Sequence, residues 1–401
     1  MNRASTKLNL EEILREDLAT VSAREKNAFD QLIAPFNQSI VLVGAGNLGR
    51  QVLTQLRKDS VEPLAFADNN TAIHGTMVNG LTVLPPHDAA AQYGRSAAFV
   101  VTIWNRNHSF TETQKTLQRL GCVKVVSVAT FRWKHPESFL PFFWADLPSK
   151  IIRQTEEIKS VFLLWADDFS RYEYLAQLQW RVWGDFDFIT RPTPQESYFP
   201  DGLFELLSHE QFVDCGAYDG MTVRQFLKRQ QFFAGRIMAF EPDPANYASL
   251  KTYTSSLDPK LGVTIDALPY AVGATRAKVR FDATGEMASA ISQAGAIEVD
   301  CFPLDDLFAQ QHFLPTFIKM DIEGTELDAL RGAQNTIRAQ VPILAICCYH
   351  HYDDLWCIPN YVHSLCSDYS IFLYPREIEG WEMVCYAVPN RRLIPQAKQM
   401  K

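Results

Sequence analysis

The stretch Lys319-Met320-Asp321-Ile322-Glu323-Gly324-Thr325-Glu326 contains the pattern from which the fold of the second half of this chain is predicted. It follows a short apolar run and precedes an amphipathic segment that ends in glycine, so it predicts a buried strand, a turn and a helix. Thr325 followed by Asp328 resembles a capping box, with Asp in the usual position of Glu. Asp321 and Glu323 would then lie at the carboxyl end of a strand, where open α/β sheets bind ligands. The alternative is that both acids only cap the helix and interact with the positive end of its dipole.

A glycine turn lies upstream of this stretch. The run Val213-Asp214-Cys215-Gly216-Ala217-Tyr218-Asp219-Gly220 predicts a strand and a turn, and residues 221–228 predict a helix. The next predicted strand, 236–240, ends in Glu241 and Pro242. An acid at a strand end about 20 residues after a glycine turn is placed to bind the two hydroxyls of a ribose. The glycine turn, this acid and the later Asp321 turn, in this order, indicate a site for a ribose-containing cofactor more specifically than any one of them does.

Residues 198–390 resemble the FkbM family of S-adenosylmethionine-dependent methyltransferases. The resemblance is carried by residues 213–220, 239–244, 271–273, 304–307 and 319–326. It implies a class I methyltransferase fold with a mostly parallel sheet and an antiparallel last strand, in a domain that usually methylates a hydroxyl group. Tyr218 departs from the wider methyltransferase pattern, because many of these enzymes have a third glycine there.

The resemblance and the predicted strand ends together give a cofactor site. The glycine turn would hold the methionine end of the cofactor, with Asp214 ordering the loop, and Glu241 would bind the ribose. The end of the third predicted strand, 262–268, would lie near the adenine. The predicted cofactor-binding residues are Asp214, Gly216, Ala217, Tyr218, Gly220, Thr222, Glu241, Pro242, Asp266 and Asp321.

The predicted catalytic residues are Asp321, His350 and Glu323. Residues 342–351 predict the fifth strand, and alternation would place Cys348 and His350 on one face. Histidine titrates near neutral pH, so His350, or alternatively Asp321, would accept the proton of the hydroxyl. The alternative is a histidine that only bonds to its loop. A metal site needs three or four convergent ligands, so no metal is predicted.

Two further positions are predicted to lie near this site. A flexible loop that includes Ser289 would border it, according to the resemblance, and Tyr198 would lie near the cofactor. Residues 278–281 and 297–301 predict an inserted pair of strands before and after this loop.

A second glycine turn lies near the start of the chain, at Val43-Gly44-Ala45-Gly46-Asn47-Leu48-Gly49. A strand precedes it, a helix follows it, and the next strand ends at Asp68, which is the full context of a dinucleotide fingerprint. The possible second nucleotide site, for NAD or another nucleotide, comprises Gly44, Gly46, Asn47, Gly49 and Asp68. This part resembles the small Rossmann-like N-terminal domain of some sugar-modifying enzymes. The alternative is a structural module in which the glycines serve tight packing alone.

The predicted organisation has two Rossmann-like, three-layer αβα domains. Residues 1–35 would form N-terminal helices, 36–130 the first domain and 198–390 the methyltransferase domain. Residues 131–197, rich in aromatic side chains, would join the domains or form a lid over the acceptor. Residues 391–401 would be a frayed tail.

Composition narrows the possible functions. The chain has 401 residues, enough for two or three domains, and its net charge of −8 argues against binding nucleic acid non-specifically. Its 8 cysteines form no C-x-x-C pair, which is typical of reduced thiols in the cytoplasm. No apolar run reaches the length of about 18 residues that predicts a membrane span, and no signal peptide is expected.

The predicted function is S-adenosylmethionine-dependent methylation of a hydroxyl on a sugar, a glycan or a small metabolite. Two alternatives remain at this point. The first is a nucleotide-dependent oxidoreductase run by the N-terminal domain, although no Tyr-x-x-x-Lys occurs in residues 36–130. The second is a non-catalytic scaffold that keeps two relic nucleotide-binding folds.

Overall fold

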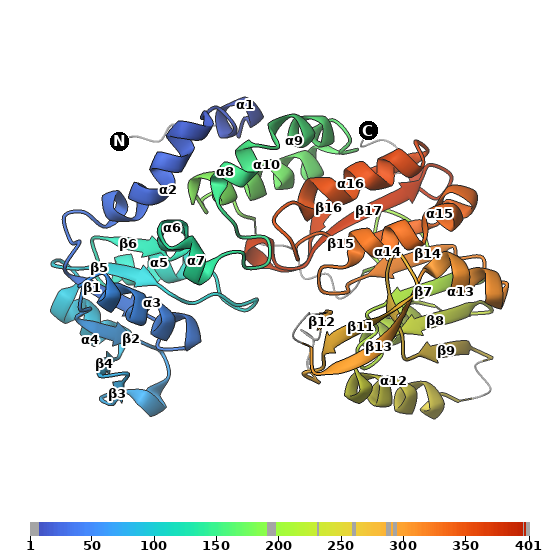
Figure 1. Ribbon diagram of the computed structural model, residues 1–401, viewed down its shortest axis with the longest axis horizontal. Helices are drawn as coiled ribbons and strands as arrows, with labels where there is room; N and C mark the ends of the chain where they lie inside the picture. Colours follow the sequence, from blue (N-terminus) through green and yellow to red (C-terminus); the bar gives the residue numbers. More distant parts are fainter. Residues whose placement is uncertain are drawn as a thin grey trace. The chain divides into compact units, whose positions relative to one another are not determined.

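The computed structural model describes residues 8–190, 198–230, 232–258, 262–285, 290–291, 295–395 and 397 (Figure 1). The chain divides into two compact units, Met1–Thr155 with Leu175–Arg191, and Glu156–Tyr174 with Pro192–Lys401. Residues 131–197, predicted as one connector, are therefore shared between the two units. No helix among the described residues is both long and apolar enough to cross a membrane.

The first unit is built on a six-stranded sheet with the order β3-β4-β2-β1-β5-β6. All neighbouring strands are parallel except β3 and β4. Its elements are α1 (Leu10–Ile13), α2 (Leu18–Ile33), β1 (Ile40–Val43), α3 (Asn47–Lys58), β2 (Ala65–Ala67), η1 (Thr71–Ile73), β3 (Met77–Val78), β4 (Leu81–Leu84), α4 (Pro86–Tyr93), β5 (Ala98–Val101), α5 (Phe110–Arg119), β6 (Val125–Ser127), α6 (Ala129–Lys134), α7 (Pro136–Phe139) and α8 (Pro148–Ile152).

The central strands of this sheet are apolar along their whole length because both faces are covered. Every residue of β1 and of β5 is buried, as expected for a parallel sheet between helices. The glycine turn after β1 packs tightly against α3. Gly44 has a φ of +106°, and a Cβ atom on Gly49 would lie 2.0 Å from the Gly44 carbonyl oxygen. Gly49 therefore serves close packing of the helix on the turn.

The second unit contains a seven-stranded sheet with the order β16-β17-β15-β14-β7-β8-β9. The pairs β15–β17 and β16–β17 are antiparallel, and the other pairs are parallel. Its elements are α9 (Thr155–Phe162) and α10 (Asp168–Trp183), which both include residues of the first unit, then β7 (Gln211–Cys215), α11 (Met221–Arg229), β8 (Arg236–Phe240), α12 (Pro244–Ser256), β9 (Thr264–Leu268), α13 (Leu304–Gln311), β14 (Phe317–Met320), α14 (Glu326–Gly332), α15 (Gln334–Gln340), β15 (Ile343–Cys347), α16 (Asp354–Leu365), β16 (Tyr369–Pro375), η3 (Ile378–Gly380) and β17 (Met383–Pro389).

The inserted strands form a separate small sheet with the order β10-β13-β11-β12. These strands are β10 (Ala271–Val272), β11 (Ala277–Asp282), β12 (Ala290–Ile291) and β13 (Ile297–Phe302). The predicted fold class is confirmed: both units are α/β, and the second has the mostly parallel sheet with antiparallel final strands. The strands β7, β8 and β9 extend the sheet to one side, and β14 and the strands after it extend it to the other. The strand order therefore switches between the parallel neighbours β7 and β14, and their carboxyl ends are the expected ligand-binding edge.

Three local predictions are wrong. β15 ends at Cys347, so Cys348 and His350 lie beyond the strand and strand alternation does not orient them. Thr325 precedes α14 without capping it through its side chain, so the capping box is not formed. Leu393 of the predicted frayed tail is buried and pairs with Phe204.

Candidate active site in the second unit

Two turns meet at the point where the strand order reverses. The Asp321 N–H, directly after β14, donates to the Cys215 carbonyl oxygen at 3.1 Å. A Cβ atom on Gly216 would lie 1.9 Å from the Asp321 carbonyl oxygen, so no larger residue fits there. The glycine turn and the acidic turn, distant in sequence, therefore form one packed structure at the ends of the neighbouring strands β7 and β14.

A buried lysine that the sequence analysis missed ties these turns together. Lys319 Nζ lies 3.0 Å from Asp214 Oδ1 and donates to the carbonyl oxygen of Gly216 at 2.7 Å. Burial lowers the pKa of Lys319, but Asp214 and Asp321 outweigh this effect and raise it. Asp214 thus contacts the lysine beneath the turn. The signal was present in the sequence, because Lys319 is a lone charge in an otherwise apolar strand.

Asp321 is surrounded by hydrogen-bond donors. The Tyr198 hydroxyl donates to Asp321 Oδ2 at 2.7 Å, and the Tyr349 hydroxyl donates to Asp321 Oδ1 at 3.4 Å. The guanidinium of Arg376 lies over the Tyr198 ring, 4.0 Å from its centroid. Tyr198, predicted to lie near the cofactor, is therefore in contact with the predicted catalytic carboxylate.

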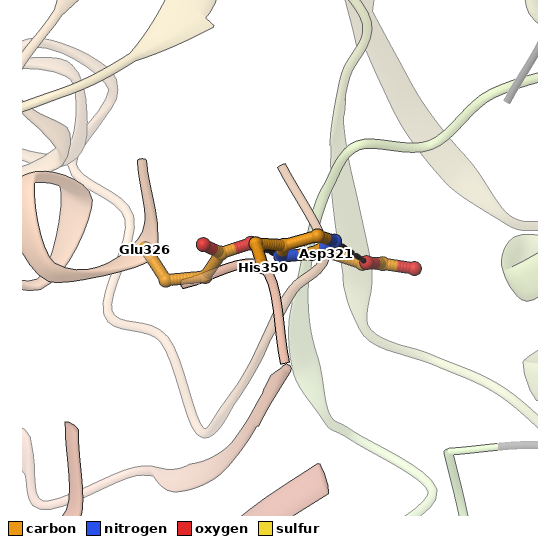
Figure 2. A group of neighbouring side chains, drawn as sticks. All are labelled: Asp321, Glu326 and His350. Carbon is orange, nitrogen blue, oxygen red and sulfur yellow. Dashed lines mark ion pairs between the residues drawn. The ribbon is translucent and has the colours of Figure 1, made fainter. Parts of the chain in front are cut away.

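The imidazole of His350 lies between carboxylates, as Figure 2 shows for Glu326 and Asp321. Nδ1 lies 2.9 Å from Glu326 Oε1, and Nε2 lies 3.4 Å from Asp321 Oδ1 and 3.7 Å from Glu323 Oε2. The three predicted catalytic residues are thus brought together, and Glu326 joins them. Glu326 accepts hydrogen bonds from the N–H groups of Ile322 and Gly324. The Thr325 hydroxyl donates to the Ile322 carbonyl oxygen and does not cap the helix.

These contacts determine the charge of His350. Burial lowers its pKa, but Glu326, Asp321 and Glu323 together raise it to about 10. For Asp321, burial raises the pKa, yet the charges of Lys319 and His350 and the hydrogen bond from Tyr198 lower it to about 2. At neutral pH the structure therefore favours an imidazolium beside an ionised carboxylate. Both ring nitrogens of an imidazolium already carry hydrogens, so this arrangement opposes the hypothesis that His350 accepts the proton.

Three residues of this cluster are also of types that bind metal ions. Asp321, Glu326 and His350 each offer one ligand atom, and these atoms lie within 4.8 Å of one another. However, Glu326 faces Nδ1 while Asp321 faces Nε2, so the two carboxylates contact opposite sides of the ring. This geometry suits a protonated imidazole better than a shared metal ion. The absence of a metal stays a prediction.

Glu241 lies at the carboxyl end of β8, as predicted. Its two carboxylate oxygens accept from the N–H groups of Tyr218, at 2.8 Å, and of Asp243, at 3.0 Å. Burial raises the pKa of Glu241 to about 7, against the effect of these two hydrogen bonds. The acid is thus bound to the glycine turn, where Tyr218 adopts a φ of +51° in place of the expected third glycine.

Four further predicted cofactor residues lie in or next to the glycine turn and the end of β8. Gly220, with a φ of +90°, directly precedes α11, Thr222 is buried in its first turn, and Pro242 follows Glu241. The Ala217 N–H donates to the Phe240 carbonyl oxygen at 2.9 Å.

Asp266 is the exception among these residues. It was expected near the adenine because the end of the third strand would lie there, but Asp266 lies inside β9 (Thr264–Leu268) and not at its end. It pairs with Met238 inside the sheet and its carboxylate lies 2.6 Å from Arg236 Nε. Ser289 falls outside the described residues.

The predicted second site is also assembled, within the first unit. Gly44, Gly46, Asn47 and Asp68 line one cavity of about 690 Å³, whereas Gly49 does not line it. The Ala45 N–H donates to Asp68 Oδ2 at 2.7 Å, so this acid holds its glycine turn in the same way as Glu241.

Comparison with known proteins supports a methyltransferase. Residues 214–366 match the family model of the methyltransferase FkbM domain. The C-terminal part of the chain therefore carries a methyltransferase FkbM domain. No curated protein matches the chain.

Several solved structures match the chain. The chain is 23% identical to methyltransferase FkbM from Methylobacillus flagellatus KT, with a TM-score of 0.71 over 94% of this chain and 97% of that one, which shows a shared fold. The match to UDP-D-quinovosamine 4-dehydrogenase from Vibrio fischeri, also 23% identical, covers 22% of this chain and 76% of that one. Its TM-score is 0.19, too low to support an inference.

Proposed function

We propose that the second unit transfers a methyl group from S-adenosylmethionine to a hydroxyl of a sugar, a glycan or a small metabolite. The observation that carries the proposal is the position of Asp321, which packs against Gly216 of the glycine turn while its carboxylate accepts a hydrogen bond from Tyr198 and lies 3.4 Å from His350 Nε2. The FkbM domain over residues 214–366 supports the reaction class. The finer part of the proposal is that the acceptor is a hydroxyl. It is supported by the presence of Asp321, a carboxylate that can accept the proton that a hydroxyl must lose.

The residues present fit such a cofactor. S-adenosylmethionine, when bound, supplies a methyl group on a positively charged sulfur. Asp321 and Glu323 place negative charge at the ligand-binding edge, where a cation is stabilised. Each oxygen of Glu241 already accepts one backbone N–H, and each keeps a further lone pair for a ribose hydroxyl.

The chain's own residues then have distinct roles. Asp321 accepts a hydrogen bond from the acceptor hydroxyl and takes its proton as the oxygen bonds to the methyl carbon, while the carbon–sulfur bond would break and leave a neutral thioether. A carboxylate is basic enough for this step, because an oxygen that has gained a methyl group before losing its proton is strongly acidic. His350, fixed by Glu326, is a positioning residue that holds Asp321. Most of the rate enhancement comes from placing the acceptor oxygen in line.

Calorimetric titration with S-adenosylhomocysteine, followed by turnover assays on a panel of sugars and phenols, tests the proposal. Wild type binds the ligand, Glu241→Ala binds it at least tenfold more weakly, and Asp321→Asn retains affinity within a few-fold but loses turnover. Folded protein that binds no S-adenosylhomocysteine contradicts the proposal. If NAD alone binds, and Asp68→Ala abolishes it, the oxidoreductase alternative replaces it.

A further inference from the structure

A cavity in the first unit lies at the carboxyl ends of β1, β2 and β5. Its volume is about 690 Å³, within the range of small-molecule sites. The strand order reverses between β1 and β5, so the cavity occupies the switch point of this sheet. Its walls come from the glycine turn, the end of β2, the segment after β5 and the α6–α7 region. They include Gly46, Asp68, Trp104, Arg132, Phe139 and Phe142.

Arg132 brings a buried positive charge to this cavity. The residue is 3% exposed, and its guanidinium packs 4.6 Å from the Trp104 ring centroid and 4.8 Å from that of Phe142. Within the described part of the chain, Nε and Nη1 of Arg132 have no hydrogen-bond partner, and no carboxylate forms an ion pair with it. Burial lowers the pKa of Arg132 to about 10, which leaves it protonated at neutral pH. An uncompensated buried cation is costly, so this position calls for an anion.

Other donors without acceptors line the same cavity. Trp104 Nε1 is buried and has no hydrogen-bond partner among the described residues. No side chain caps the first turn of α3, whose 12 residues begin directly after Gly46. A Cβ atom on Gly46 would meet no atom within 4 Å, so the space beside this helix end is open. Helix N-termini that follow glycine turns bind phosphate through their N–H groups.

We propose that this cavity binds the diphosphate of a nucleoside diphosphate unit, with Arg132 and Trp104 donating to phosphate oxygens. Asp68 provides the site for a ribose: each of its oxygens accepts one backbone N–H, from Ala45 and from Asn70, and keeps a lone pair for a hydroxyl. Phe139 and Phe142 supply apolar surface for a base or a sugar ring. This inference concerns the first unit alone and does not depend on the methyltransferase proposal.

Titration calorimetry with UDP, inorganic pyrophosphate and uridine on the full chain tests the ligand class. UDP is the main probe because it lacks the adenine that the second unit is proposed to bind. We expect UDP to bind, pyrophosphate to compete with it, and uridine to bind at least tenfold more weakly, since charge-assisted hydrogen bonds to phosphate are the strong ones. Equal binding of uridine and UDP, or no binding of either diphosphate, overturns the proposal.

Arg132→Met separates a binding role from a structural one. Methionine keeps apolar packing against Trp104 and Phe142 and removes the unpaired charge. We expect the melting temperature of the ligand-free variant to stay the same or rise, while the increase that UDP produces in wild type is lost. Arg95→Met, at an exposed arginine outside the cavity, is the matched control and keeps the response to UDP. A variant that melts lower and still responds to UDP shows that Arg132 is only structural.

Gly46→Ala is a second, independent test. Gly46 has a φ of −71° and open space around the new methyl group, so the variant is expected to fold as wild type does. The methyl group would occupy the position from which a phosphate approaches the α3 N-terminus. UDP affinity should fall at least tenfold. If both Gly46→Ala and Arg132→Met bind UDP like wild type, the proposed site is wrong.

Discussion

At the scale of single residues, the charge of Asp321 is set by neighbours rather than by exposure to water. Burial alone would favour the neutral acid, yet Lys319, His350 and Tyr198 lower its pKa to about 2. The hydrogen bond from Tyr198, at 2.7 Å, is the shortest of the contacts to its carboxylate that are described above. Removing this one donor should therefore affect the reaction more than the binding of the cofactor.

Tyr198→Phe is predicted to lower turnover about 10- to 100-fold, because the Tyr198 hydroxyl fixes the orientation of the Asp321 carboxylate towards the acceptor, and a misplaced catalytic group costs up to about 100-fold. Affinity for S-adenosylhomocysteine should change by less than a few-fold. Steady-state kinetics and calorimetry measure the two effects separately. Tyr361→Phe, at a partly exposed tyrosine on α16, is the control and should leave both unchanged. Loss of affinity without loss of turnover would contradict the role of Tyr198.

The ion pair between His350 and Glu326 predicts how stability depends on pH. The pKa of His350 is raised from 6.5 to about 10 in the folded chain, so the protonated ring stabilises the fold. This contribution is complete below about pH 6.5 and is lost as the pH rises towards 10. In Glu326→Gln, the free energy of unfolding should be lower at pH 7 and should depend less on pH between 7 and 10. Urea unfolding between pH 7 and 10 measures this pH dependence. If the free energy of unfolding changes with pH as steeply in the variant as in wild type, His350 is neutral in the fold.

At the scale of elements, β14 carries both the lysine beneath the glycine turn and the acid that follows the strand. Lys319 and Asp214 face each other across neighbouring parallel strands, and both are buried. A buried pair of this kind contributes little net stability as a pair, but removing one partner leaves an unpaired charge in the interior. The turn that is proposed to hold the cofactor therefore depends on a charge pair from two different strands.

Lys319→Met is predicted to lower the free energy of unfolding by about 3–5 kcal/mol, and adding Asp214→Leu should recover part of this loss. Chemical denaturation of the single and double variants measures both. Lys278→Met is the matched control, because Lys278 pairs with Asp300 at 3.6 Å with its side chain 65% exposed. An exposed pair contributes about 0–1 kcal/mol, so the control should be nearly neutral. A mild effect of Lys319→Met would mean that Asp214 is protonated in the fold.

At the scale of the whole molecule, the two units share one local arrangement. In each, an acid at the end of the second parallel strand accepts a hydrogen bond from the glycine turn: Asp68 from Ala45, and Glu241 from Tyr218. The surroundings differ, because a buried arginine lines the first site and a cluster of carboxylates lines the second. These surroundings underlie the two proposals, an anionic ligand in the first unit and a cationic cofactor in the second.

Hydrogen exchange should therefore show two independent ligand footprints. S-adenosylhomocysteine should slow exchange at residues 216–222 and 321–326, and UDP should slow exchange at residues 44–49, because bound ligands suppress local opening of the turns they contact. Mass spectrometry of the full chain with each ligand measures this. Protection of residues 216–222 by UDP would place the phosphate ligand in the second unit and contradict the assignment of the two sites.

The sequence by itself determined the features that depend on neighbours along the chain. The glycine turns, the strand-end positions of Glu241, Asp68 and Asp321, and the α/β class all follow from periodicity and turn chemistry, and the structure has them in place. Where a prediction needed the exact end of an element, as for His350 after β15, it was wrong, because local patterns do not fix such ends.

Only the tertiary structure decided how the charges are paired. Tyr198 reaches Asp321, and Lys319 reaches Asp214, across more than a hundred residues of chain. Glu326 turns towards His350 and keeps it protonated, which changes its proposed role from base to positioning residue. The physical reason is that the charge of a buried group depends on the partners that the sheet topology brings within a few ångströms, and strand order is not a local property of the sequence.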